Sequence, residues 1–215
     1  MPLHIVSTPI GNLADITLRA LETLKEADLI LAEDTRRTQT LLTHYKISTP
    51  MKSFNDHNKE KLTPTIIPQL KEQNISLVSD AGTPCISDPG FYLVREAIKH
   101  EISIHSIPGP SASIAALSIS GLPTDKFLFL GFIPKKGREN FFTNLPTNTT
   151  IILYESPHRI TKTLTILTKT LPEAQLCLAR ELTKKFETIE RGTPEEILKK
   201  APFKGEITLL IYKKG

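Results

Sequence analysis

Short apolar runs alternate with helical stripes through the first 120 residues. Between the runs, apolar residues recur at helical spacing, as they do after Asp15, where Ile16, Ala20, Leu24 and Ala27 share one face. Asp15 is expected to cap that helix. Four of the runs have the length and composition of buried strands: LHIVS, DLILA, ISLVS and ISIHSI. This alternation predicts a mostly parallel sheet with helices on both faces.

The second half of the chain has more strand candidates and fewer helices. We expect helices over 157–171 and 193–200. The segment ARELT…ETIERG is typical of a hairpin, so antiparallel pairing and a mixed α/β domain are expected. We place the boundary at 121–124, which divides the chain into domains 1–121 and 122–215. Five segments are predicted strands: KFLFLGFI, TTIILYE, AQLCLARELT, ETIERG and GEITLLIY.

Length and composition fit a globular protein with a sizeable core. The chain has 215 residues, and its two cysteines, Cys85 and Cys177, lie far apart, which favours a reducing compartment over a disulfide framework. The first ten residues lack the basic and long apolar segments of a signal peptide. The longest apolar run, FLFLGFI, is far shorter than the ~20 residues that span a bilayer. We therefore expect a cytoplasmic protein.

Charge is distributed unevenly along the chain. The formal net charge is +4, but residues 1–124 carry 11 basic and 13 acidic side chains, whereas residues 125–215 carry 16 and 10. A basic half suggests a polyanionic partner. An ordinary solvated lysine surface explains the same numbers, so charge alone leaves both interpretations open.

Four sharp loops follow predicted strands and are rich in Gly, Pro and small hydroxyl residues. In an open α/β sheet, ligands bind beyond the carboxyl ends of the strands. Glycine lets backbone approach a ligand closely, and proline fixes a loop without adding bulk. Four such loops in consecutive units favour a composite ligand cleft over simple turns. The loops are Ser7–Asn12, Ala32–Arg37, Ser79–Gly90 and Pro108–Ser113.

Several common site types lack their motifs. The sequence has neither a P-loop nor the G-x-G-x-x-G dinucleotide fingerprint. The six histidines are scattered, so no metal site is predicted. Ser111 does not lie in a G-x-S-x-G elbow, and Cys85 has no partner histidine in a motif, so neither is expected to be a nucleophile.

Five segments together resemble the ribosomal RNA small-subunit methyltransferase I family, which belongs to the tetrapyrrole-methylase-like superfamily. The similarity extends from Leu3 to about Tyr212, and the tandem DAGTP…SDPG and YESPHR blocks are its most specific part. Many members of that family continue beyond the last strand, whereas this sequence ends at Gly215. The segments are STPIGNLADITLRALETLKEADLILAEDTRRT, VSDAGTPCISDPG, PGPSASIAALSISGLPTDKFLFLGF, LYESPHRI and ARELTKKFE.

The resemblance implies a two-domain α/β fold with S-adenosyl-L-methionine in the cleft between the domains. It also implies 2′-O-methylation of a cytidine ribose in the decoding region of 16S rRNA, and a homodimer. Thr83 replaces the Asp of the superfamily's Gly-Asp-Pro turn, so Asp80 is expected to supply negative charge for the cofactor ammonium. The resemblance places ten residues at the cofactor: Pro9, Gly11, Asp80, Gly82, Thr83, Pro84, Ile86, Ser111, Ala112 and Tyr154.

Ribose methylation needs an oriented 2′-hydroxyl and a group that accepts its proton. Glu155 or Glu181 is our candidate near that hydroxyl, and Arg36 and Arg180 are candidates for phosphate or structural pairing. Basic residues of the second half are expected to contact the RNA backbone, on 16S rRNA or the 30S subunit, in a salt-dependent way. They are Lys135, Lys136, Arg138, Lys184 and Lys185.

Two alternatives remain open from the sequence: a C-methylase that acts on a tetrapyrrole such as a precorrin, and an RNA-binding relative that has lost catalysis. The two acidic turns of SDAGTPCISDPG are also expected to differ in role. Asp80 is predicted to face the cofactor. Asp88 is predicted to cap the next helix, with Pro89 at its first position.

Overall fold

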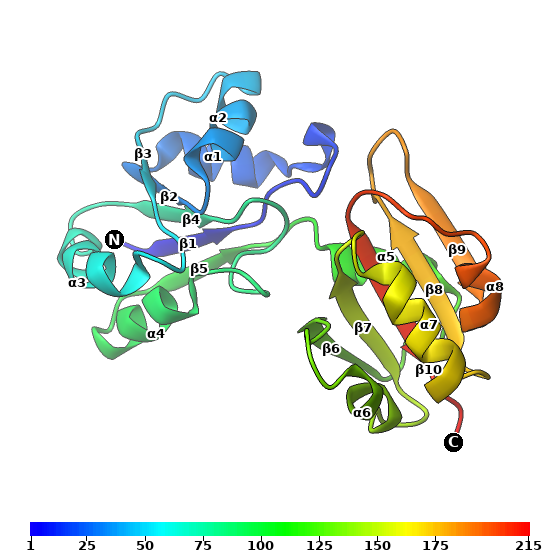
Figure 1. Ribbon diagram of the computed structural model, residues 1–215. Coiled ribbons are helices and arrows are strands. Elements are labelled where there is room, and N and C mark those ends of the chain that lie inside the picture. Colours follow the sequence, from blue (N-terminus) through cyan, green and yellow to red (C-terminus); the bar gives the residue numbers. More distant parts are fainter. The chain divides into compact units, whose positions relative to one another are not determined.

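A computed structural model describes residues 1–215 (Figure 1). The chain forms two compact units, Met1–Ser111 and Ala112–Gly215. The predicted fold class, a parallel first sheet and a mixed second sheet with helices, is confirmed. No helix is long and apolar enough to cross a membrane.

The first unit is built on a five-stranded parallel sheet in the order β3-β2-β4-β1-β5. The short strand β3 was not predicted from the sequence. The strands are β1 (Leu3–Val6), β2 (Leu29–Ala32), β3 (Met51–Ser53), β4 (Ile75–Val78) and β5 (Ile104–Ile107). The helices are the 3-10 turn η1 (Leu13–Asp15), α1 (Leu18–Glu26), α2 (Thr35–His44), α3 (Lys59–Gln69) and α4 (Phe91–Lys99).

Side-chain alternation along the strands places helices on both faces of this sheet (Figure 1). In β2, Leu31 packs toward α3 and α4, whereas Ile30 and Ala32 pack toward α1 and α2. Both faces are therefore buried, which explains why these strands are continuous apolar runs rather than alternating ones. The carboxyl ends of the parallel strands share one edge, and the four predicted loops begin there.

The helix cap predicted at Asp15 is wrong. Asp15 ends the turn η1, whose cap is Asn12, and α1 begins three residues later at Leu18. The side chain of Thr17 caps α1 by accepting a hydrogen bond from the backbone N–H of Ala20 at 3.1 Å. Both Asp15 and Thr17 are good N-cap residue types, so composition alone does not decide between them.

The second unit has a mixed sheet in the order β6-β7-β10-β8-β9, in which β6 runs parallel to β7 and the other pairs are antiparallel. All five strands were predicted. They are β6 (Phe127–Phe132), β7 (Thr150–Glu155), β8 (Gln175–Arg180), β9 (Thr188–Gly192) and β10 (Ile207–Tyr212). The helices are α5 (Ala112–Ser120), α6 (Arg138–Thr143), α7 (Ile160–Thr170) and α8 (Pro194–Leu198).

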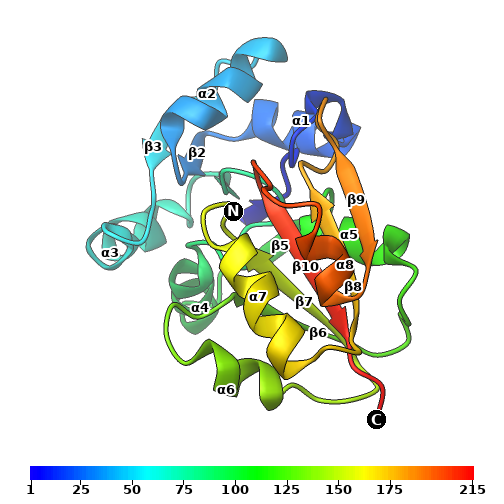
Figure 2. The same cartoon turned by 45° about the vertical axis from the view of Figure 1, so that its right-hand side comes forward.

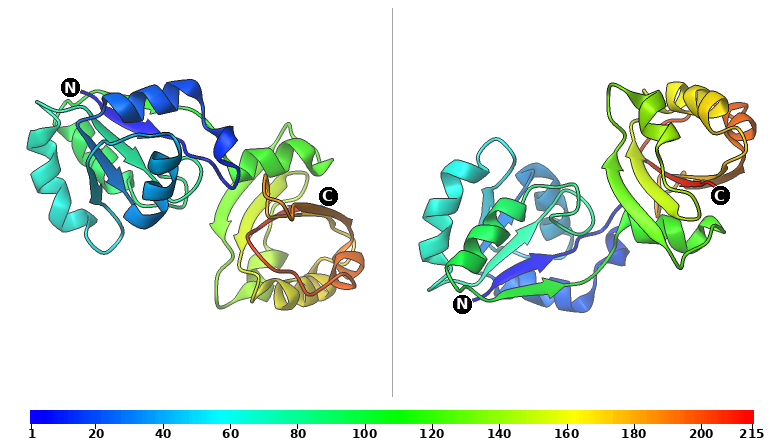
Figure 3. Two further views of the ribbon diagram at one scale, coloured as in Figure 1. Left: turned by 90° about the horizontal axis from the view of Figure 1, so that it is seen from above. Right: turned by 90° about the horizontal axis from the view of Figure 1, so that it is seen from below.

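The sheet of the second unit lies between two helical layers (Figures 2 and 3). Helices α6, α7 and α8 cover one face through a core that includes Phe142, Leu164 and Ile197. Helix α5 packs against β7, β8 and β10 on the other face. Because α5 completes this unit, the second unit begins at Ala112, ten residues before the boundary expected at 121/122.

Candidate functional site

The loops after β1 and β4 are joined by backbone hydrogen bonds. The N–H of Thr8 donates to the carbonyl of Gly82 at 2.9 Å, and the N–H of Gly82 donates back to Thr8 at 3.0 Å. The Thr8 hydroxyl also donates to the carbonyl of Ser79 at 3.3 Å. Two of the predicted ligand loops thus form one fixed surface at the carboxyl edge of the sheet.

Thr83 connects this surface to the loop after β5. Its hydroxyl lies 3.0 Å from the hydroxyl of Ser7 and donates to the carbonyl of Pro110 at 3.3 Å. The Thr83 hydroxyl therefore links three loops through its contacts with Ser7 and Pro110. We expect its contribution to a ligand to be the position of the backbone, rather than the hydroxyl itself.

Two glycines are required by the geometry of these loops. Gly82 has φ of +85°, a conformation that side-chain-bearing residues rarely adopt. A Cβ on Gly109 would lie 2.9 Å from the Cβ of Ser7, which is too close without a shift of one loop. Among the other predicted cofactor residues, Gly11 is exposed, Pro9, Ser111 and Ala112 are half-buried, and Pro84 is buried.

Acidic side chains gather where β2 and β4 end. The Asp80 carboxylate accepts from the backbone N–H of Asp34 at 3.0 Å, and the Arg37 Nε lies 3.5 Å from it. In return, Glu33 accepts from the backbone N–H of Asp80 at 3.2 Å. Burial and the charges of Asp80 and Asp56 raise the pKa of Glu33. Negative charge in this group exceeds what the nearby arginine offsets.

Asp88 joins this acidic group instead of capping a helix, so that prediction is wrong. Helix α4 begins at Phe91, and Gly90 occupies the N-cap position with φ of +138° and no side-chain cap. Burial, followed by the charge of Glu33, raises the pKa of Asp88 to about 7. Three carboxyl groups, Glu33, Asp80 and Asp88, thus interact electrostatically at this edge, and we call them the acidic group.

Two apolar side chains of the β4–α4 loop, those of Cys85 and Ile86, differ in exposure. Ile86 is 44% exposed. Cys85 lies beneath the loop, and burial together with the charge of Asp88 raises the pKa of its thiol to about 11. A Cβ on Gly90 would lie 2.7 Å from the Cys85 Sγ. Cys85 therefore fills space as predicted, and Ile86 is the apolar side chain that a ligand can reach.

Arg36 lies at the start of α2, and its side chain is 89% exposed. Its guanidinium donates to both carboxylate oxygens of Asp34, at 3.0 and 2.6 Å. Hydrogen bonds from Arg36 lower the pKa of Asp34 to about 2, so this carboxylate is ionised at neutral pH. Arg36 is exposed enough to meet a phosphate, and it shares its charge with Asp34.

Glu155 has a different environment at the end of β7. Its carboxylate is fully buried and accepts from the Thr163 hydroxyl at 2.7 Å and from the backbone N–H of Ser156 at 2.7 Å. Arg159 forms an ion pair with it at 2.5 Å, and the Arg138 guanidinium lies 3.9 Å away. Because its oxygens are saturated and away from solvent, we correct its expected role from proton acceptor to internal brace.

Arg138, predicted to contact RNA, belongs to this same buried cluster. Only 8% of its side chain is exposed, and its guanidinium donates to the carbonyl of Pro134 at 3.0 Å and to the Thr163 hydroxyl at 3.2 Å. Its expected RNA contact is therefore corrected to an internal one. Lys135 and Lys136, which precede it, are exposed. Their contact with the RNA backbone stays a prediction.

Arg180 ends β8 and Glu181 begins the β8–β9 loop, and both side chains form hydrogen bonds within the second unit. Arg180 donates three hydrogen bonds, to the Thr188 hydroxyl and to the carbonyls of Phe186 and Lys204. Glu181 accepts from the backbone N–H of Glu206 at 2.8 Å and from Lys184 at 3.0 Å. The first of these contacts is the main cause of the lowered pKa of Glu181.

Tyr154 is half-buried on β7, one residue before Glu155. Its ring makes edge contacts with Phe129, at 5.0 Å between ring centroids, and with Phe132, at 5.5 Å. Both phenylalanines belong to the edge strand β6. The expected contact of Tyr154 with the cofactor stays a prediction.

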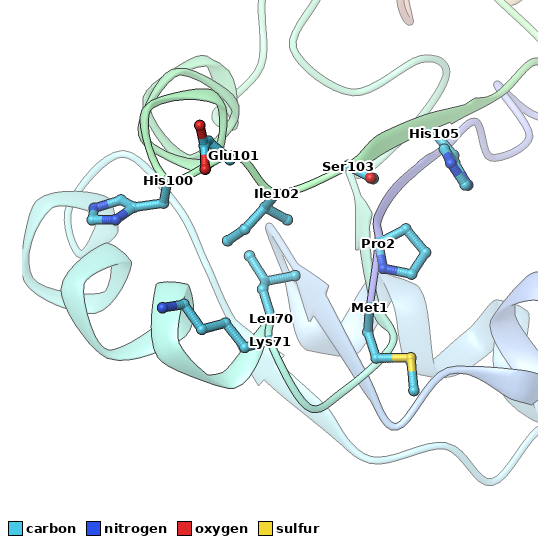
Figure 4. A pocket seen from close by; sticks show the side chains of 9 residues that line it. All are labelled: Met1, Pro2, Leu70, Lys71, His100, Glu101, Ile102, Ser103 and His105. Carbon is cyan, nitrogen blue, oxygen red and sulfur yellow. The ribbon is translucent and has the colours of Figure 1, made fainter.

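An open depression of about 460 Å³ lies at the opposite edge of the first sheet, where its strands begin (Figure 4). Met1, Pro2 and Ser103 line it, together with Lys71 and His105. None of the predicted site residues borders it. The acidic group and its loops, rather than this depression, therefore constitute the candidate site of the first unit.

Comparison with known proteins gives consistent results. Residues 2–198 match the family of Tetrapyrrole (Corrin/Porphyrin) Methylases. A protein of Halalkalibacterium halodurans named "Ribosomal RNA small subunit methyltransferase I" is 48% identical over 99% of this chain and 76% of its own length. A protein of the same name from Thermotoga maritima is 46% identical over 97% of each chain.

Solved structures share the fold at low sequence identity. A uroporphyrin-III C-methyltransferase from Thermus thermophilus, crystallised as a complex with S-adenosylhomocysteine, superposes with a TM-score of 0.66 at 17% identity. The match covers 99% of this chain and 97% of that one. At this identity the likeness establishes the architecture alone.

Proposed function

Since this chain belongs to the ribosomal RNA small subunit methyltransferase I family, within the tetrapyrrole methylases, we propose that it methylates the 2′-oxygen of a cytidine ribose in the decoding region of 16S rRNA. The methyl donor is S-adenosylmethionine. The observation that carries the proposal is the acidic group, set among fixed loops at the carboxyl edge of the first sheet.

The chemistry of these loops fits the donor. S-adenosylmethionine carries two positive charges, an ammonium and a sulfonium, and the acidic group supplies more negative charge than Arg37 offsets. Opposite charges within a few ångströms favour the ionised carboxylates. Asp80 is our candidate for the ammonium contact, and the exposed Ile86 is a candidate for apolar contact.

The loop around Gly82 is held in place by its backbone pair with Thr8 and by the hydroxyl of Thr83. A pre-organised surface loses little conformational entropy when a ligand binds. The proposed cofactor set is the one predicted from the sequence, and Thr83 acts in it through the loop it fixes.

When bound, the donor supplies an electrophilic methyl carbon. The protein must hold the ribose 2′-oxygen in line with that carbon, and such orientation can account for a large part of the rate. Among the two acids predicted near this oxygen, Glu181 is the one with solvent access, at 19% exposed, and we retain it as the candidate acceptor of the hydroxyl proton. Arg36 and the exposed Lys135 and Lys136 are candidates for phosphate contacts.

Methyl transfer from labelled S-adenosylmethionine tests the proposal. The acceptors are 30S subunits, deproteinised 16S rRNA and a tetrapyrrole precursor, and labelled RNA is digested to nucleosides. The expected product is 2′-O-methylcytidine. Label in the tetrapyrrole alone would make the chain a C-methylase, and cofactor binding without transfer to any acceptor would make it a non-catalytic relative.

Two further properties belong to this proposal. We propose a cytoplasmic location, because the substrate is ribosomal RNA. We also propose a homodimer, on the family resemblance. Sedimentation equilibrium checks the second point against a chain mass of 24.0 kDa.

A further inference from the structure

Phe186 is an exposed aromatic residue in a tightly folded loop. It lies in the segment between β8 and β9, and 65% of its side chain is exposed. Leu182, the other apolar residue of this segment, is buried and only 8% exposed. The loop therefore already has its own apolar anchor, and Phe186 is not needed for that purpose.

The loop around Phe186 is held firmly. The guanidinium of Arg180 donates to the carbonyl of Phe186 itself at 2.8 Å, and to the carbonyl of Lys204 at 3.1 Å. Across the loop, the backbone N–H of Thr183 donates to the Glu187 carboxylate at 2.5 Å. A ring presented on fixed backbone loses little entropy when it meets a partner.

An ammonium and a carboxylate, those of Lys185 and Glu187, flank the ring in sequence. Lys184 is neutralised by ion pairs with Glu181 at 3.0 Å and Glu206 at 2.9 Å. Lys185 forms no ion pair in the structure, and its Nζ lies 5.6 Å from the centre of the Phe186 ring. The loop thus presents one exposed aromatic ring with the ammonium of Lys185 near it, and the carboxylate of Glu187 is directed to the backbone N–H of Thr183.

We propose that Phe186 is a stacking platform for an unstacked base of the RNA substrate and that Lys185 contacts a phosphate next to that base. Single-stranded RNA is recognised in this way, by rings that stack on bases and cations that follow the backbone. The inference rests on the proposed function and names Phe186 as a side chain that contacts the RNA substrate.

A protein partner suits this surface less well. Phe186 is flanked by the charged residues Lys185 and Glu187, both exposed, so the ring is isolated rather than part of a wide apolar patch. Protein interfaces have cores from which charged residues are depleted. A nucleobase needs only one ring face and one nearby cation.

The test compares variants of Phe186 in two assays. In the first, methyl transfer to 30S subunits gives KM values for RNA and for S-adenosylmethionine. Phe186→Ala is expected to raise the KM for RNA about tenfold, the scale of one lost base stack, and to leave the KM for the cofactor unchanged. Phe186→Trp should preserve the parent value, whereas Phe186→Leu, which is apolar but cannot stack as a ring, should behave like Phe186→Ala.

The second assay measures binding of a fluorescein-labelled single-stranded oligoribonucleotide and does not depend on transfer. Phe186→Ala should weaken binding about tenfold, and Lys185→Gln should flatten the dependence of log affinity on log salt by about 0.7. If the parent transfers no methyl to RNA, the proposed function fails, while this assay still decides on the platform.

Phe91→Ala is the matched control, because Phe91 is also 65% exposed and has a cation, Arg95, 5.7 Å from its ring. Arg95 is partly neutralised by Glu96 at 3.5 Å, so this control should leave RNA affinity unchanged. Equal RNA affinity of the parent and Phe186→Ala, with equal melting temperatures, would overturn the proposal. Parent-like behaviour of Phe186→Leu would also overturn it, as would a change of sedimenting mass in Phe186→Ala, which would indicate a contact between copies.

Discussion

Acids end parallel strands in both units, yet their environments are opposite. In the first unit, Glu33 and Asp80 follow β2 and β4, and together with Asp88 they carry more charge than Arg37 offsets. In the second unit, Glu155 ends β7 with two guanidiniums and a hydroxyl packed around it. The first arrangement leaves room for an external cation, and the second supplies its own cations internally.

Of the acids at these strand ends, we expect only those whose charge the fold leaves uncompensated to bind a cation. The motifs AEDTRR and YESPHR look alike, because each places an arginine within a few residues of an acid. In the first motif, Arg36 forms an ion pair with Asp34. In the second, Arg159 turns back onto Glu155, and Arg138 comes from a helix 17 residues earlier.

The largest effect is expected from removing the internal acid. Glu155→Ala leaves the buried Arg138 and the part-buried Arg159 without their anion, and loss of one partner of a buried pair costs about 3–5 kcal/mol of unfolding free energy. Urea denaturation measures it. Glu195→Ala, which removes an exposed pair with Lys199, is the control and should change stability by less than ~0.5 kcal/mol. Equal small effects for both variants would remove the contrast between the two units.

A smaller effect, on binding rather than folding, is expected at the first-unit acids. Asp80→Asn should weaken binding of S-adenosylmethionine about tenfold, equivalent to ~1.4 kcal/mol, because the cofactor ammonium loses a charged partner. Titration calorimetry measures it. Asp125→Asn, at an exposed acid outside the first-unit loops, should bind like the parent. An unchanged dissociation constant in Asp80→Asn would move the ammonium contact elsewhere.

A pH dependence of stability is expected from Asp88. Its folded pKa is raised from 3.8 to about 7, so its contribution to stability is present below pH 3.8 and is lost as the pH rises to about 7. Asp88→Asn removes that loss and should melt at a higher temperature than the parent at pH 8, with the difference shrinking toward pH 4. Differential scanning calorimetry across this range checks it.

The same group should couple cofactor binding to pH. A bound cation favours the ionised form of Asp88, so the affinity of the parent for S-adenosylmethionine should rise between pH 6 and 7, by at most tenfold per unit for one proton. Asp88→Asn should flatten this dependence, whereas Asp125→Asn, at an exposed acid outside the loops, should retain it. A flat profile in the parent would mean that Asp88 does not sense the cofactor.

Periodicity predicted most of the architecture, since buried strands and amphipathic helices leave strong patterns. Short elements escaped it. Helix α6 has six residues, follows two lysines and a glycine, and was not among the predicted helices. Missing this helix also hid the burial of Arg138, because the side chain is buried only when Arg138–Thr143 is helical and packs on α7.

The candidate site was predictable in position and less so in detail. The four loops were located because glycine, proline and hydroxyl residues mark strand ends in sequence. Whether Asp88 serves as a cap depends on where α4 begins, and the helix, with Gly90 at its N-cap, begins two residues later than expected. Glu155 is compensated by Arg159, four residues later, and also by Arg138, which lies 17 residues earlier and whose approach local patterns do not encode.

The state of the two thiols has a practical consequence for spectroscopy. Cys177 is fully buried, and burial raises the pKa of both thiols, that of Cys85 to about 11. The thiolate is the nucleophile that attacks an alkylating reagent, so both native cysteines react slowly at neutral pH. A cysteine introduced on an exposed surface therefore takes up a maleimide fluorophore or spin label first. Distances within the protein become measurable without first replacing the native cysteines.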